Sequence, residues 1–165
     1  MKSSALTLAQ SSRARLAVRV LGALLLLFVG ADHYYEYSVD HYSALPTIGT
    51  LFLLNFVSAS LIGLILLAPM GRVLRRFGTV ALELAAISGF GVAASSLAAL
   101  LISEQTKLFG FMESNYRPAI VIAIASEAAA ALFLALLLAL TLAAKRSTSK
   151  PNRRGRPGAV SPATG

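Results

Sequence analysis

One stretch of the chain carries no charged side chain over its whole length: PTIGTLFLLNFVSASLIGLILLA, residues 46–68. A helix needs about 20 apolar residues to cross the ~30 Å hydrocarbon core of a bilayer. Only helices and closed barrels can cross lipid, because every backbone polar group needs a partner within the protein. The stretch is too long and too continuously apolar for a barrel strand. It therefore predicts a membrane-spanning helix and decides the fold class.

Three further segments have a similar length and apolar character, and they cover residues 16–35, 78–102 and 118–144. The segment 78–102 contains one acid, Glu83, and the segment 118–144 contains one acid, Glu127. Short connections between the segments favour a compact arrangement. The sequence therefore predicts an all-α membrane protein, a bundle of four transmembrane helices.

The first segment has a second interpretation, in which it belongs to a cleaved signal peptide. Residues 13–19 then form the basic n-region and residues 20–30 the apolar h-region. Cleavage would leave three helices without changing the sidedness of the rest. We favour a retained helix, because the n-region is long and the aromatic residues after it are typical of an interfacial anchor.

The basic residues predict the orientation of the bundle. All Lys and Arg residues except Lys107 and Arg117 lie before or at the start of the first helix, between the second and third helices, or in the tail. Cytoplasmic loops carry such an excess of basic residues. The sequence therefore predicts that both termini lie in the cytoplasm. This distribution also explains the net charge of +8 without a nucleic-acid partner.

The tail, residues 145–165, is basic and contains no acid. It is rich in Pro, Gly, Ser and Thr, so it cannot bury a core and is predicted to be disordered. We expect it, with the basic loop at residues 72–76, to contact anionic lipid head groups. A membrane-protein partner or a second copy of the chain is the other partner that we expect in the bilayer.

Small residues recur at spacings of four in three helices, which favours close helix packing in lipid. The rows are Asn55, Ala59 and Gly63; Ala81, Ala85, Gly89 and Ala93; and Ala123, Glu127, Ala131, Ala135, Ala139 and Ala143.

Glu127 and Asn55 form the candidate polar site within the membrane. Each lies nine residues after the proline that opens its segment, or ~13–14 Å deep at 1.5 Å per residue. We predict that both face the bundle interior and can hydrogen-bond, with Ser95, Ser96 or Ser126 at the same level. Burial in apolar surroundings favours the neutral acid. A proton or cation relay is one interpretation. We favour a structural role, in which the protonated acid joins neighbouring helices through hydrogen bonds. A single buried acid without a second buried ionisable partner makes a poor proton pathway.

Glu83 is a candidate interfacial acid. It lies about five residues inside its segment, or ~7–8 Å from the end. The basic residues Arg72, Arg75 and Arg76 precede it closely in sequence. We predict that its side chain extends toward the membrane surface and pairs with that loop.

The densest polar cluster is ADHYYEYSVDHY, residues 31–42. His33, Glu36, Asp40 and His41 are weak candidate metal ligands, since imidazole and carboxylate suit zinc or copper. In a continuous helix His33 and His41 would lie ~12 Å apart, too far to share one ion. We favour an aromatic belt at the membrane surface with solvated acids around it.

The segment Pro46-Thr-Ile-Gly-Thr-Leu-Phe-Leu-Leu-Asn55, together with the Tyr- and His-bearing residues before it, resembles part of a family of small four-helix membrane proteins of actinobacteria. The resemblance covers residues 33–68 and rests mostly on apolar residues. It implies four helices and a bacterial plasma membrane. It implies no reaction, cofactor or catalytic residue.

The sequence contains no enzyme signature. It has no cysteine, no nucleophile elbow, no phosphate-binding glycine loop and no metalloprotease helix motif. We therefore expect neither catalysis nor a cofactor, and we favour a structural or accessory membrane component. The alternatives are a small proton- or ion-linked transport module that uses Glu127, and a redox subunit that binds metal or haem.

Overall fold

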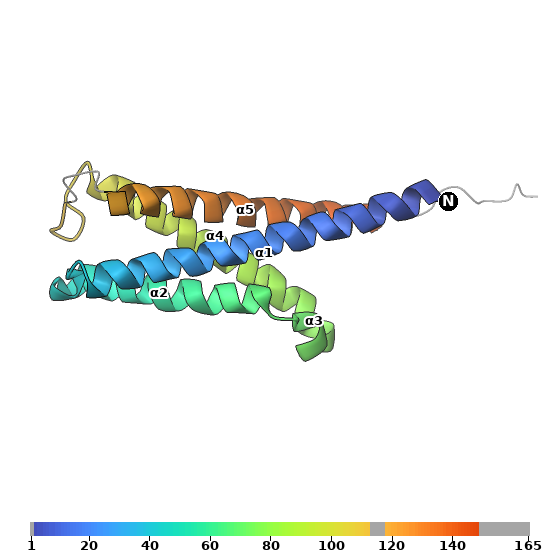
Figure 1. Cartoon of the computed structure of the whole chain (residues 1–165), viewed down its shortest axis with the longest axis horizontal. Helices are drawn as coiled ribbons and strands as arrows, with labels where there is room; N and C mark the ends of the chain where they lie inside the picture. The colour runs from blue at the N-terminus through green and yellow to red at the C-terminus, as the bar shows by residue number, and fades with distance from the viewer. Residues whose placement is uncertain (1, 113–117, 149–165) are drawn as a thin grey trace, which may run out of the picture.

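The computed structural model describes residues 2–112 and 118–148, with side chains over residues 12–112 and 118–147. Its long helices are α1 (Lys2–Ser38), α2 (Pro46–Leu67), α4 (Gly78–Ser103) and α5 (Pro118–Thr148) (Figure 1). Shorter helical turns, η1 (Tyr42–Ala44), α3 (Met70–Val73) and η2 (Arg75–Phe77), lie between them. Within the described residues, four helices are long and apolar enough to cross a membrane, which confirms the predicted four-helix membrane fold.

The first and last helices extend beyond their predicted ends. Helix α1 begins at Lys2, ahead of the predicted start at residue 16, and continues through the polar residues 36–38, whereas α5 includes residues 145–148 of the predicted tail. Hydropathy marks only the part of a helix that lipid can cover, whereas helical hydrogen bonding continues until a turn interrupts it. Such a turn occurs at His41, where φ is 61°. Residues 149–165, the rest of the predicted disordered tail, lie outside the described residues.

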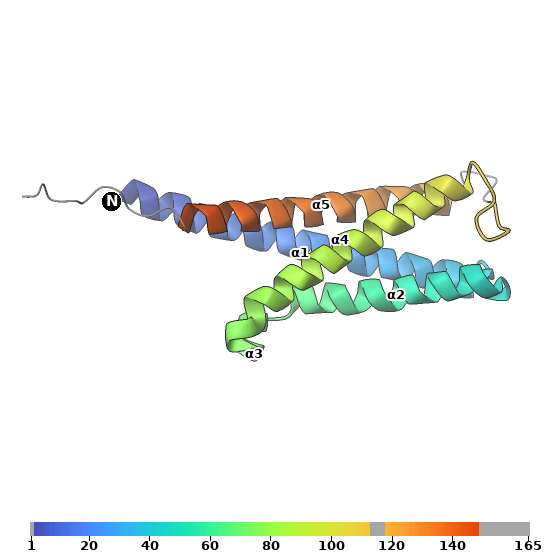
Figure 2. The same ribbon diagram turned by 180° about the vertical axis from the view of Figure 1, so that it is seen from behind.

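The four long helices surround a common core. Helix α1 packs against α2 and α5, and α4 packs against the same two helices, so that α1 and α4 lie diagonally opposite. Helix α4 runs obliquely: it begins near the end of α2 and ends near the beginning of α5 (Figure 2). The chain therefore enters and leaves the bundle at the same end, where α1 begins and α5 finishes.

Small residues allow the helices to approach closely. A Cβ on Gly63 of α2 would lie 2.8 Å from Leu27 Cγ and 3.1 Å from the Ala23 carbonyl oxygen of α1. A Cβ on Gly89 of α4 would lie 3.0 Å from Leu26 and 3.1 Å from Leu134. Such close approach supplies dispersion contacts in lipid, where burial of apolar area alone gives little driving force.

The rows of small residues predicted for α2 and α4 face the interior, but the row predicted for α5 does so only in part. Ala123 and Glu127 are buried, whereas Ala135, Ala139 and Ala143 are exposed. A step of four residues turns a helix by ~400°, so each step moves the row ~40° around the axis. Over twenty residues the row rotates about 200°, and its end faces outward. Ala130, Leu134 and Leu137 instead continue the buried face.

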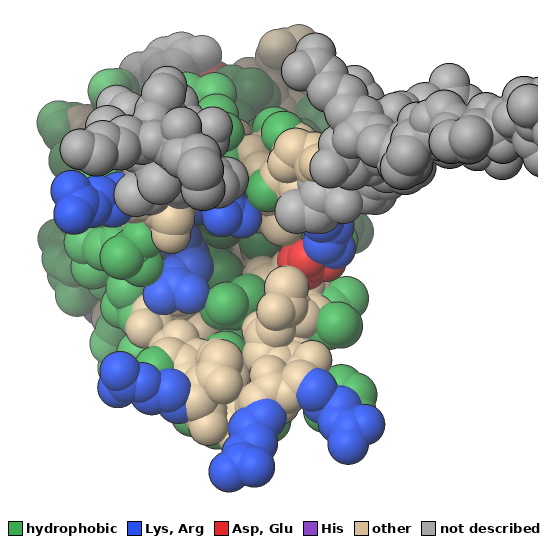
Figure 3. Space-filling model, turned by 90° about the vertical axis from the view of Figure 1, so that its right-hand side faces the viewer, with side chains coloured by type: hydrophobic (Ala, Val, Ile, Leu, Met, Phe, Trp, Pro, Cys, Tyr) green, Lys and Arg blue, Asp and Glu red, His purple; other side chains and the backbone are tan. Residues whose placement is uncertain are grey.

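The outer surface and the two ends of the bundle differ in character. Large apolar side chains are exposed along all four long helices, as expected for a surface in contact with lipid. Lys and Arg side chains gather at the end where α1 begins (Figure 3). Asp32, Glu36, Asp40 and Glu104 belong to the opposite half of the bundle. Among the described residues, basic side chains therefore predominate at one end of the bundle and acidic side chains at the other.

Candidate functional site

A cavity of about 450 Å³ lies in the half of the bundle away from the basic end. Its wall is formed by all four long helices, where the oblique course of α4 separates that helix from α2. A tight turn at Leu108–Phe111 also lines the cavity. In this turn the Leu108 amide donates to the Phe111 carbonyl, and the Phe111 amide donates to the Leu108 carbonyl. Phe109 and Gly110 adopt φ values of 51° and 82° in this turn. We call this cavity the acidic pocket.

Three acids and one histidine line the acidic pocket: Asp32, His33 and Glu36 of α1, and Glu127 of α5. His33 is 7% exposed, Glu36 is 3% exposed and Glu127 is 1% exposed. No Lys or Arg is among the residues that line it. The remaining wall is mostly apolar and aromatic, so the acids lie in surroundings that solvate charge poorly.

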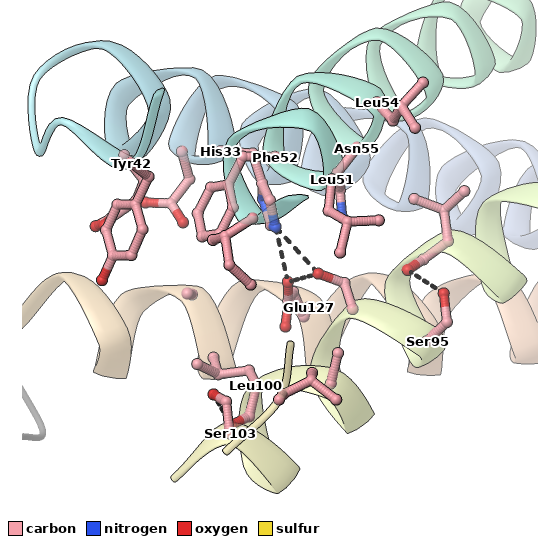
Figure 4. A pocket seen from close by; sticks show the side chains of 18 of the residues that line it. His33, Tyr42, Leu51, Phe52, Leu54, Asn55, Ser95, Leu100, Ser103 and Glu127 are labelled. Atoms are coloured by element: carbon pink, nitrogen blue, oxygen red, sulfur yellow. Dashed lines mark hydrogen bonds and ion pairs between the residues drawn. The ribbon is translucent and has the colours of Figure 1, made fainter. Parts of the chain in front are cut away.

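The imidazole of His33 and the carboxyl of Glu127 point toward one another across the pocket wall (Figure 4). His33 Nε2 lies 3.5 Å from Glu127 Oε1. The Ser96 hydroxyl of α4 lies between them, 2.5 Å from Glu127 Oε1 and 3.0 Å from His33 Nε2. Three helices thus contribute one side chain each to a carboxyl–hydroxyl–imidazole chain.

The hydrogen bond that His33 Nδ1 makes determines which of the two ring nitrogens can gain or lose a proton. His33 Nδ1 lies 2.9 Å from the Val29 carbonyl oxygen of the preceding helical turn. A carbonyl oxygen only accepts hydrogen bonds, so Nδ1 carries a proton and donates it. Nε2, which faces Ser96, is therefore the atom that gains or loses a proton.

Ser96 permits two proton arrangements of equal total charge. In the first, a neutral Glu127 donates to the Ser96 oxygen, and the Ser96 hydroxyl donates to Nε2 of a neutral His33. In the second, the doubly protonated His33 donates to Ser96, and Ser96 donates to the Glu127 carboxylate. A shift of two protons along the chain interconverts them. The site can thus move a proton between α5 and α1 without adding charge to the membrane interior.

Glu127 retains one acceptor that the chain itself does not satisfy. Its Oε2 is buried without a hydrogen-bond partner, and so is Oδ1 of Asn55. Both residues line the acidic pocket, as their similar predicted depth suggested. The expected hydrogen bond between them is absent from the described contacts, and Glu127 Oε1 accepts a hydrogen bond from Ser96. Ser95 and Ser126 bond to carbonyl oxygens of their own helices.

The remaining candidate ligands are spread apart. Asp40 and His41 lie beyond the end of α1, and the His41 side chain is exposed. Within the described residues no three His, Asp or Glu side chains are grouped so that they could hold one metal ion. His33 and Glu36 are buried in the bundle, so Glu36 is not one of the solvated acids expected around the aromatic belt.

Glu83 pairs with a residue of α5 rather than with the basic loop that was expected to be its partner. Its carboxyl oxygens lie 2.7 Å from Lys145 Nζ of α5, rather than against the arginines of the preceding loop. Glu83 also lines a second cavity of about 340 Å³, near Arg15 and Arg19 of α1. This basic-end cavity is closed off from the acidic pocket by a layer of buried apolar residues that includes Leu26 and Leu134.

Sequence reasoning missed His33 as the partner of Glu127. The available signal was the stripe Ala23, Leu26, Val29, His33 and Glu36, whose spacings of three and four mark one helix face. Comparisons of the chain with family models, with curated proteins and with solved structures find no match.

Proposed function

We propose that this protein is a small proton-linked transport module of the cell membrane. The observation that supports the proposal is the buried chain of Glu127, Ser96 and His33. Ionisable side chains inside a membrane-spanning bundle are costly and characteristically serve as proton or ion relays. The sequence alone favoured a structural role because Glu127 lacked a second buried ionisable partner, and His33 is such a partner.

The distribution of empty space also supports transport. The acidic pocket and the basic-end cavity lie toward opposite ends of the bundle. Between them, Leu26 and Leu134 are fully buried and converge on Gly89. A proton or solute that crosses must pass this apolar layer, so the module works by opening one cavity at a time. Glu127 lies on the wall of the acidic pocket, where it is loaded from that side.

The orientation that we propose places the basic end in the cytoplasm and the acidic pocket toward the outside. Arg72, Arg75 and Arg76 lie between α2 and α4 at the basic end, with Lys145 at the end of α5. Basic residues near helix ends are retained on the cytoplasmic side during insertion. Both termini would then be cytoplasmic, and the basic residues would contact anionic lipid head groups.

Proton movement through purified protein tests the function. The protein is reconstituted into liposomes that contain a pH-sensitive dye, and a potassium gradient with valinomycin makes the lumen negative. We expect the wild-type protein to acidify the lumen faster than protein-free liposomes. Glu127→Gln removes the exchangeable proton while keeping the shape of the side chain, so it should reduce the rate to that of protein-free liposomes.

Glu104→Gln is the matched control, because it makes the same chemical change in a carboxyl that lines neither cavity. It should conduct protons at close to the wild-type rate. Size-exclusion profiles of all three proteins verify that each remains folded. Equal rates for the wild-type protein and Glu127→Gln would refute the proposed function.

A further inference from the structure

The acidic pocket has the chemistry of a site for a positively charged ligand. It contains three carboxyl side chains, and the only basic group among the residues that line it is His33. Ionised carboxyls in apolar surroundings require a counter-charge. His33 can neutralise one of them, and no Lys or Arg is among the lining residues.

Unsatisfied acceptors mark where such a ligand would bind. Glu127 is 1% exposed, lines the pocket and has a buried Oε2 without a hydrogen-bond partner. Asn55 Oδ1, on the same pocket wall, also has none. Buried polar atoms are almost always paired in folded proteins. Two unpaired acceptors beside one cavity therefore indicate a missing donor or cation.

Aromatic rings supply the second element of cation recognition. Tyr42 and Phe52 stack with centroids 4.9 Å apart, and Phe111 meets Tyr42 edge-on at 5.4 Å. All three line the acidic pocket. Ring faces attract cations, most strongly where water is excluded. The surrounding wall of leucine, isoleucine and phenylalanine favours an organic ion with a large apolar surface over a hydrated metal ion.

We propose that the acidic pocket binds a lipophilic organic cation, an amine or quaternary ion of low charge density, whose charge faces Glu127. This inference rests on the proposed proton-linked function, for which it names the ligand class. The cation and the proton compete for the same carboxyl, so binding of one releases the other. Besides Glu127, the titratable groups that face the pocket are Asp32, His33, Glu36 and Tyr42; the lining residues of α2 and α4 include none.

Binding of tetraphenylphosphonium to protein in lipid nanodiscs tests the ligand class, and tetraphenylborate is the size-matched anion. Equilibrium dialysis against empty nanodiscs corrects for partition into lipid. We expect saturable binding of the cation and none of the anion. Measured at two pH values, the affinity for the cation should be lower at the more acidic one, because protons compete with the cation for the carboxyls.

Two variants locate the binding site. Glu127→Gln should weaken cation binding about tenfold to hundredfold, as expected for the loss of one interaction with a charged group. Leu51→Trp places a large ring in the pocket from a position that is already partly exposed, and it should abolish binding without disturbing the core. Leu61→Trp, at an exposed position of the same helix away from the pocket, is its control and should bind normally.

The outcomes separate the two proposals. Absence of saturable cation binding at both pH values, or binding that Leu51→Trp leaves unchanged, would overturn the ligand class. Proton flux that still depends on Glu127 would then keep the proposed function intact. Conversely, cation binding with no proton flux dependent on Glu127, and no effect of pH, would overturn the transport function and leave only a cation-binding pocket.

Discussion

His33 and Glu127, on the first and last long helices, approach to 3.5 Å between Nε2 and Oε1 inside the membrane-spanning bundle. The Ser96 hydroxyl of a third helix bonds to the carboxyl and lies within hydrogen-bond distance of the ring. Each group alone would be a costly polar atom in apolar surroundings. Together they form a unit that can hold its protons in two arrangements of equal total charge.

Ser96→Ala should interrupt proton movement while leaving both ionisable groups in place. The 3.5 Å between His33 Nε2 and Glu127 Oε1 is too long for an efficient hydrogen bond. The Ser96 hydroxyl is therefore the group that connects them. We expect a lower proton flux in the liposome assay and a loss of about 1–3 kcal/mol in stability, because the Glu127 carboxyl loses its donor. Ser95→Ala is the control, since that hydroxyl bonds to the Val92 carbonyl of its own helix. If the two variants conducted protons equally well, the connecting role of Ser96 would be wrong.

The two nitrogens of His33 should respond differently to the loss of Glu127. Nδ1 is held by the Val29 carbonyl, whereas Nε2 faces the exchangeable chain. In protein labelled with ¹⁵N-histidine, we expect Glu127→Gln to shift the Nε2 resonance of His33 and to leave Nδ1 protonated. His41, the second histidine of the sequence, has an exposed side chain and should be unaffected. A change confined to His41, or none at all, would contradict the assigned geometry.

The helices and their approximate bounds could be predicted from the sequence, because a bilayer imposes a simple length and composition requirement. The site could be predicted only in part. The depth of Glu127 and Asn55 follows from the rise of a helix, and both do line the same pocket. Their partners depend on helix rotation and on which helices are neighbours, and an apolar sequence specifies neither strongly. Glu127 therefore bonds Ser96 and approaches His33, not Asn55.

Two particular errors show how small angular effects accumulate. The row of alanines on α5 was assigned a spacing of four, which drifts ~40° per step from a period of 3.6. Ala139 and Ala143 consequently face outward. On α1, the polar residues 31–42 were assigned to an aromatic belt at the membrane surface with solvated acids around it. Their helical phase instead continues that of Leu26 and Val29, so His33 is buried.

Gly89→Leu should destabilise the bundle, whereas Gly91→Leu should not. A Cβ at Gly89 would lie 3.0–3.2 Å from side chains of α1, α2 and α5, and Leu adds three further carbons in a site without room. Overpacking of this kind costs about 1–3 kcal/mol. Gly91 lies on the same helix with open space around its Cα, so the same substitution there controls for helix propensity and hydrophobicity. Thermal unfolding in detergent, followed by circular dichroism, should give a lower midpoint for Gly89→Leu only. Equal midpoints would mean that the close approach of the helices at Gly89 does not contribute to stability.

Single cysteines can test the proposed orientation without background, because the chain contains no native cysteine. Gly71→Cys lies between α2 and α4 at the basic end, in open space, and Thr106→Cys lies exposed after α4 at the opposite end. Basic residues are retained in the cytoplasm, so we expect a membrane-impermeant maleimide to label Thr106→Cys in intact cells and Gly71→Cys only after the membrane is opened. The four crossings require the two sites to lie on opposite sides of the membrane. Labelling of Gly71→Cys alone in intact cells would reverse the orientation and place the acidic pocket toward the cytoplasm. Labelling of both would contradict the four-helix crossing itself.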